Sequence, residues 1–138
     1  MEGEAFESKL KHLEFVQGVI TRMNSNSFSL KGWMVTIVAG FLAIFAAGKD
    51  LNELFLFVAV APTMLFWFLD AYYLQLEKKY RFLYDDVKSS VAEPFDMNAN
   101  GYNVSYLKVL FSKTEWTLYL VIIILLIAGG VLGLCGIY

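Results

Sequence analysis

The chain contains little of what builds disulfide frameworks, metal centres and nucleophilic catalysts. Its 138 residues include one cysteine and one histidine. A single cysteine, Cys135, excludes an intrachain disulfide and a cysteine-cluster metal site. The histidine, His12, has no Cys, Ser or Asp nucleophile at a recognisable spacing, and it falls on the polar side of an amphipathic helix, which predicts a surface position. We therefore expect no enzyme activity, no metal site and no cofactor.

The chain also lacks an excess of either charge. It has 11 basic and 13 acidic residues, with a formal net charge of −2. In residues 1–32 and 75–116, which flank the apolar runs described below, basic and acidic residues occur in equal numbers. A surface that binds phosphate groups needs a local excess of positive charge. No nucleic-acid partner is therefore expected, and anionic-lipid anchoring has little support.

What the chain has in abundance is apolar sequence. Hydrophobic residues make up 58% of it, above the roughly 45–50% of soluble domains. Three apolar runs stand out, at residues 33–48, 54–74 and 117–138. The first run is short for a bilayer core of about 30 Å, so Leu30 and the stem of Lys31 are expected to extend it. The predicted fold class is an all-α membrane protein with three transmembrane helices in a lipid bilayer and a small cytoplasmic helical cap.

The distribution of positive charge sets the expected topology. Cytoplasmic loops of membrane proteins carry an excess of Lys and Arg. Basic residues precede the first run and separate the second run from the third, whereas only Lys49 lies between the first two. The N-terminus is therefore expected inside the cell and the C-terminus outside. Three tryptophans at the expected inner interface support this topology as membrane-interface anchors: Trp33, Trp67 and Trp116.

Four segments follow from this topology. They are a cytoplasmic amphipathic helix at 1–29, a transmembrane hairpin at 30–74, a cytoplasmic helical extension and loop at 75–115, and a third span at 116–138. The first 32 residues are charged and lack an early apolar region, so we expect no cleaved signal peptide. The second span contains Pro62, which removes a backbone donor and predicts a kink near mid-membrane.

Two cytoplasmic stripes at helical spacing are expected to pack together as the cap. The first comprises Phe6, Leu10, Leu13, Gln17, Ile20 and Met23, and the second Tyr73, Leu76, Tyr80, Leu83 and Val87. The pattern then fails over a loop at 89–103, which precedes a short amphipathic helix at 104–111. The loop resembles a calcium-binding loop from Asp96 onward. It has Leu107 where such a loop needs a glutamate, so calcium binding is not expected.

Asp70 is the only ionisable residue inside an apolar run. An ionisable residue within a membrane segment is by default a functional hypothesis. Two interpretations stay open. Asp70 lies near the depth of Lys31 and can form a structural ion pair with it, or it can line or gate a channel.

Small residues predict where helices approach closely. One stripe lies on the first span and one on the third: Ala39, Ala43 and Ala47, and Gly129, Gly133 and Gly136. One stripe is enough to pack three helices into a protomer, so the other is free for self-association, and a homo-oligomer is expected. Three helices alone enclose no aqueous path. A pore therefore needs an oligomer in which Thr36, Asp70 or the outer end of the third span faces a shared axis.

The membrane boundaries of the spans carry recognisable segments. They are residues 22–33, residues 66–74 with Glu77, Tyr80, Arg81 and 83–85, and residues 110–114. These resemble a widespread family of small bacterial three-span membrane proteins. The architecture is similar to that of SLATT-type membrane effectors and of the small accessory membrane proteins of RADAR-like anti-phage operons. The resemblance marks as positions of interest Arg22, Asn26, Ser27, Lys31, Trp33, Asp70, Tyr73 and Arg81.

Two classes of function remain. The resemblance implies an oligomeric effector of the bacterial inner membrane in anti-phage defence, which permeabilises or depolarises the membrane when its cap receives a signal from a sensor protein or a nucleotide. The alternative is a non-conducting anchor or partner-binding subunit of a cytoplasmic complex. A phage-type holin fits less well, because three-span holins usually have the N-terminus outside.

Overall fold

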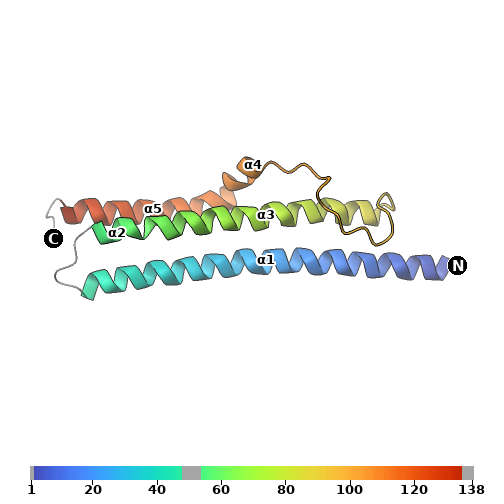
Figure 1. Ribbon diagram of the computed structural model, residues 1–138, viewed down its shortest axis with the longest axis horizontal. Coiled ribbons are helices and arrows are strands. Elements are labelled where there is room, and N and C mark those ends of the chain that lie inside the picture. The colour runs from blue at the N-terminus through green and yellow to red at the C-terminus, as the bar shows by residue number, and fades with distance from the viewer. Residues whose placement is uncertain (1, 48–53, 135–138) are drawn as a thin grey trace.

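The computed structural model describes residues 2–47 and 54–134, and all regular structure in these ranges is helical (Figure 1). The helices are α1 (Glu2–Ala47), α2 (Leu54–Val58), α3 (Val60–Lys88), α4 (Tyr106–Leu110) and α5 (Lys113–Leu134). Three stretches are long and apolar enough to cross a membrane: Gly3–Ala47, Leu54–Lys88 and Glu115–Leu132. The expected all-helical class is confirmed, with three helices long and apolar enough to span a membrane, whereas the topology and the cap stay predictions.

Two helices run without interruption from the expected cap into the expected spans. The 46 residues of α1 extend over about 69 Å at 1.5 Å per residue, more than twice the bilayer core. α3 continues past the apolar run to Lys88 and lies alongside α1 (Figure 1). The expected cap and the expected membrane part therefore share two continuous helices.

The second span is broken near its start. α2 ends at Val58 and α3 begins at Val60, and the backbone N–H of Ala59 donates to the carbonyl of Leu56 at 3.2 Å. Pro62 lies in the first turn of α3, where a missing N–H is tolerated. The predicted kink near mid-membrane is therefore wrong: the irregularity is a break three residues before Pro62, toward the connection to α1.

The cap has an apolar core formed by α1, α3 and the loop that follows α3. Its buried residues are Val16, Ile20, Leu83, Val87 and Ala99. α1 and α3 pack together here as predicted, while the cytoplasmic location of this core stays a prediction, and the predicted stripe on α1 is only partly correct. Phe6, Leu10 and Gln17 are exposed, and the buried face lies further around the helix, at Val16 and Val19.

The loop is fixed to α1 by His12, which corrects the prediction of a surface histidine. The side chain is only 3% exposed. Nε2 bonds the carbonyl of Asp96 at 2.8 Å, Nδ1 accepts the backbone N–H of Phe95 at 3.2 Å, and the ring stacks on Phe95. The polar side of the helix faces backbone groups of the loop. The path of the loop therefore decides whether this side of the helix is exposed to solvent or buried.

The calcium-like segment of the loop is a pair of side-chain-capped turns. Asp96 Oδ1 accepts the N–H of Asn98 at 2.8 Å, and Asn98 Oδ1 accepts the N–H of Asn100 at 3.0 Å. Such turns explain the spacing of these residues without a metal. The short helix predicted at 104–111 is present as α4, and Gln75 Nε2 ties its approach to α3 by donating to the carbonyl of Val104 at 2.6 Å.

Candidate functional site

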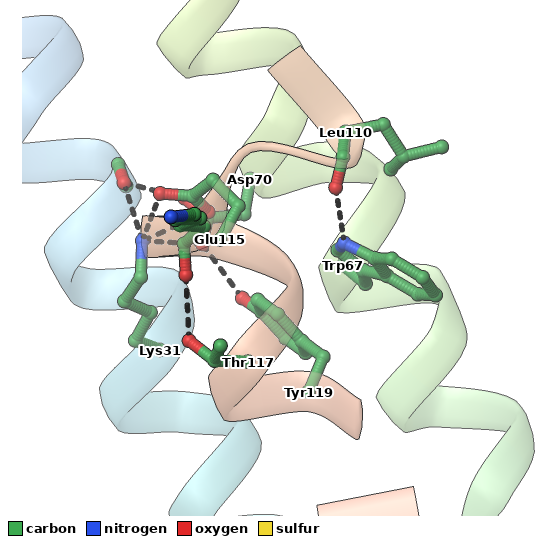
Figure 2. Close-up of polar contacts among 9 residues, drawn as sticks. Lys31, Trp67, Asp70, Leu110, Glu115, Thr117 and Tyr119 are labelled. Atoms are coloured by element: carbon green, nitrogen blue, oxygen red, sulfur yellow. Dashed lines mark hydrogen bonds and ion pairs between the residues drawn. The ribbon is translucent and has the colours of Figure 1, made fainter. Parts of the chain in front are cut away.

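Three charged side chains from three different helices meet where the cap joins the expected spans (Figure 2). Lys31 comes from α1, Asp70 from α3 and Glu115 from the first turn of α5. Ser27, one helical turn before Lys31, and Tyr119, one turn after Glu115, complete the cluster. We call these five residues the charge network.

The ammonium group of Lys31 lies at the centre of the charge network. Nζ is 2.5 Å from Asp70 Oδ2 and 3.2 Å from both carboxyl oxygens of Glu115. It also donates to Ser27 Oγ at 3.0 Å. Three acceptor groups match the three hydrogens of an ammonium. The pairing of Asp70 with Lys31 that the sequence suggested is therefore present, with a second carboxyl group added to it.

The two carboxyl groups differ in how well they are satisfied. Asp70 is 0% exposed; its Oδ1 accepts the hydroxyl of Ser27, and its Oδ2 accepts Lys31 and the hydroxyl of Tyr119, the latter at 2.8 Å. Glu115 is 2% exposed and bonds Lys31. Donors around a carboxylate stabilise its charged form. Asp70 is therefore the better-compensated anion of the pair.

The charges in the network do not balance. Two carboxylates face one ammonium, so full ionisation leaves one excess negative charge at a site shielded from water. Removing a charge from water costs several kcal/mol unless partners compensate it. The excess falls on Glu115, because Asp70 has three donors and Glu115 shares one.

Aromatic and aliphatic side chains close the network on its membrane side. The ring of Tyr119 stacks on Trp67 with centroids 6.2 Å apart, and Trp67 Nε1 donates to the carbonyl of Leu110 at 3.1 Å (Figure 2). Beyond Tyr119, Met34 and Leu126 are buried in an apolar cluster. Among the described residues on that side, the one buried polar side chain is Thr63, which bonds the carbonyl of Ala59. The described part of a single chain thus offers no continuous polar path.

The other candidate functional residues lie outside the network. Arg81 pairs with the buried carboxyl of Glu77, through Nε at 2.9 Å and Nη2 at 2.6 Å. Asn26 and Tyr73 line a shallow hollow beside Trp33, and Arg22 is exposed. Of the six predicted functional positions, only Lys31 and Asp70 belong to the charge network, and Asn26 and Tyr73 lie together at the hollow.

Glu115 and Tyr119 were missed as site residues. Glu115 was assigned to the cytoplasmic segment because it precedes the third apolar run. Its position along the sequence could have indicated its role. Glu115 precedes Trp116, an expected interface anchor, and so lies at the same expected depth in the membrane as Trp33 and Lys31. Tyr119 is a polar hydroxyl in an otherwise apolar stretch, which is a weaker signal of the same kind.

The two small-residue stripes have different positions. A methyl group added at Gly129 would lie 3.3 Å from Leu56 Cδ1, and one at Gly130 only 2.7 Å from Phe57 Cε2. Glycines of α5 therefore allow close packing against α2 within the protomer. Gly133 also lies in α5, whereas Gly136 lies outside the described residues. The remaining stripe faces outward, with exposed Ala39, Ala43 and Ala47.

Comparisons of the chain with protein-family models, curated proteins and solved structures found no match. Two features of the described residues bear on function. They are the charge network, which lies near the inner ends of the expected spans, and the apolar core that α1 and α3 form in the expected cap.

Proposed function

We propose that the protein is an oligomeric effector of a bacterial inner membrane, acting in anti-phage defence, that permeabilises or depolarises the membrane when its cytoplasmic cap is activated. The observation that supports this function best is the position of the charge network. It joins all three long helices at the point where α1 and α3 pass from the cap into the spans. A displacement of α1 against α3 in the cap acts on Lys31 and Asp70.

In the resting chain, the network holds the charges of Lys31, Asp70 and Glu115 together, away from any aqueous path. Lys31 contacts both carboxyl groups, and Trp67 and Tyr119 close the apolar side. Activation separates Lys31 from Asp70, which leaves charged groups that must find water or new partners. In an oligomer, these groups line a shared aqueous path, because three helices of one chain cannot enclose it.

The signal is a cytoplasmic sensor protein or a nucleotide that binds the cap. A hollow of about 350 Å³ lies between the start of α1 and the loop, lined by Lys9, His12, Ser90 and Glu93 among others. Lys9 Nζ donates to Ser90 Oγ at 2.8 Å across this hollow. A ligand that replaces this bond changes how the loop is held on α1.

The test is membrane depolarisation in bacteria that express the protein, followed with a potential-sensitive dye. The wild type is expected to depolarise the membrane on activation, and Asp70→Asn is expected to abolish this, because the aqueous path then lacks the charge of Asp70. Asp85→Asn is the matched control, because it makes the same change at an exposed position of the same helix. An Asp70→Asn protein as active as the wild type would remove Asp70 from the gating mechanism.

A second function, a non-conducting anchor that binds a cytoplasmic partner, is favoured by exposed aromatic residues of the cap. Phe15 and Phe95 contact each other with ring centroids 6.3 Å apart, and both are exposed to solvent, as is Phe82. Large exposed apolar groups on a water-facing surface mark interaction sites. This function predicts no depolarisation under any condition, and a partner that co-purifies with the wild type but not with Phe15→Ser.

A further inference from the structure

A groove between α1 and α3 stays open in the cap. Two adjoining hollows form it, of about 290 and 340 Å³, which share Gln17, Ile20 and Arg81. Phe28 borders one of them and is 77% exposed. The residues that line the two hollows belong to α1 and α3, and none of them belongs to the loop. We call it the cap groove.

A second groove lies within the membrane part, between α1 and α5. It has a volume of about 230 Å³, and every residue that lines it is aliphatic: Val35, Val38, Ala39, Leu42, Ile122, Leu125 and Leu126. We call it the membrane groove. Near its inner end, the side chains of Lys31 and Glu115 join α1 to α5.

The two grooves lie along one face of α1. Thr21 and Phe28 in the cap groove and Val35 and Leu42 in the membrane groove follow each other at intervals of seven residues. Gln17 and Asn24 form a second row with the same spacing beside them. Leu10, seven residues before Gln17, extends this face and is exposed. Positions seven residues apart lie close together around an α-helix, so these residues form one face that runs from the cap groove to the membrane groove.

We propose that this face of α1 pairs with the same face of α1 in a second copy of the chain, in parallel and along both the cap groove and the membrane groove. The proposal rests on the oligomer of the proposed function and names its interface. Copies inserted in the same orientation have parallel helices, and a two-fold axis along the membrane normal brings identical faces together.

The extent of the face identifies the second copy as its occupant. A soluble partner can cover only the cap groove, and a lipid chain can cover only the membrane groove. A second α1, also 46 residues long, covers both at once. Asn24 supports this assignment, because an asparagine at one core position of a parallel helix pair fixes register by bonding to its own copy.

Cysteine cross-linking in membranes tests the interface. In a Cys135→Ser background, Asn24→Cys and Val35→Cys each place one thiol on the proposed face, in the cap and in the membrane. Gly18→Cys and Gly40→Cys are the matched controls, because they lie about 120° and 140° around the helix from these positions and a Cβ at either glycine meets no atom within 4 Å. Oxidation is expected to convert most of the Asn24→Cys and Val35→Cys proteins to dimers and to leave the controls monomeric.

The other outcomes overturn the proposal in distinct ways. Cross-linking at Asn24→Cys alone restricts the pairing to the cap, and cross-linking of the controls to the same degree shows random collision. Neither result affects depolarisation by the wild type, so the proposed function is judged separately. As a second measurement, Phe28→Asp is expected to halve the detergent-corrected mass in light scattering, whereas Gly18→Asp leaves it unchanged. An unchanged mass for Phe28→Asp contradicts the interface.

Discussion

The same two helices are joined in two chemically different ways. In the cap, α1 and α3 meet through apolar side chains such as Val16 and Leu83. At the start of the spans, they meet through Lys31 and Asp70, with no water-exposed surface on the aspartate. Burying apolar groups drives association in water, but it gives no advantage in lipid, where the surroundings are equally apolar. Directional polar contacts take over at the membrane boundary.

This difference separates two tasks along one helix pair. Apolar contacts in the cap are non-directional and tolerate small displacements of α1 against α3. The charge network joins three helices through Lys31, Asp70 and Glu115, and its hydrogen bonds depend on distance and direction. Under the proposed function, a displacement of α1 against α3 therefore meets its main resistance at the network.

Removing the cation of the network is expected to have the largest effect. Lys31→Met leaves Asp70 and Glu115 without their shared partner, and breaking a buried ion pair in this way costs about 3–5 kcal/mol. Thermal unfolding in mild detergent, followed by circular dichroism, measures the loss. Lys11→Met is the control, because Lys11 is exposed on the same helix. Its Nζ lies 3.9 Å from Glu7 Oε1, a distance typical of a weak surface pair. Equal stability of the two variants would show that the network contributes nothing.

Truncating the cap core is expected to have the next largest effect. Leu83 is fully buried, and Leu83→Ala removes its packing and leaves a cavity, at about 3 kcal/mol. Leu69→Ala makes the same change at an exposed position of α3 that faces lipid in the expected topology, and it should change stability little. If Leu69→Ala lowers stability as much as Leu83→Ala, the comparison is wrong, because apolar contacts would then stabilise both environments equally.

The two carboxyl groups of the network are expected to respond unequally. Asp70→Asn places an amide N–H₂ among the donors of Ser27, Lys31 and Tyr119, whereas Glu115→Gln removes the excess negative charge and leaves the Lys31–Asp70 pair. We expect Asp70→Asn to be less stable than Glu115→Gln by about 1–3 kcal/mol. The same thermal unfolding assay compares them directly. The reverse order would mean that Glu115 is the better-compensated anion.

The sequence alone predicted where the helices lie better than it predicted which residues of different segments contact each other. Apolar runs are governed by local composition, so three spans and the continuation of α3 into the cap were predictable. The depth of Lys31 and Asp70 suggested their pairing. Tertiary placement decided the rest: the burial of His12 depends on the loop's course, and Glu115 joins the network only because α5 begins beside Lys31. Neither follows from periodicity.

The smallest expected effect concerns Tyr102 in the loop. This side chain is partly exposed, whereas the carboxyl groups of the charge network are buried. The hydroxyl of Tyr102 donates to Asp86 Oδ2, and burial, this hydrogen bond and the negative charges of Asp86 and Asp96 raise the pKa of Tyr102 to about 12. The fold favours the neutral phenol. The stabilisation by this contact is therefore complete below the unfolded pKa of about 10 and is lost as the pH rises through 12.

The difference in near-ultraviolet absorbance between the wild type and Tyr102→Phe isolates the titration of this one phenol. We expect its midpoint near pH 12, and Asp86→Asn should move it down because the negative charge beside the phenol is lost. A midpoint near 10 in the wild type would mean that the loop does not close on α3 in solution. Because Tyr102 lies on the loop and Trp67 beside the network, Trp67 fluorescence that stays constant across this titration would show that the loop contact opens while the network remains closed.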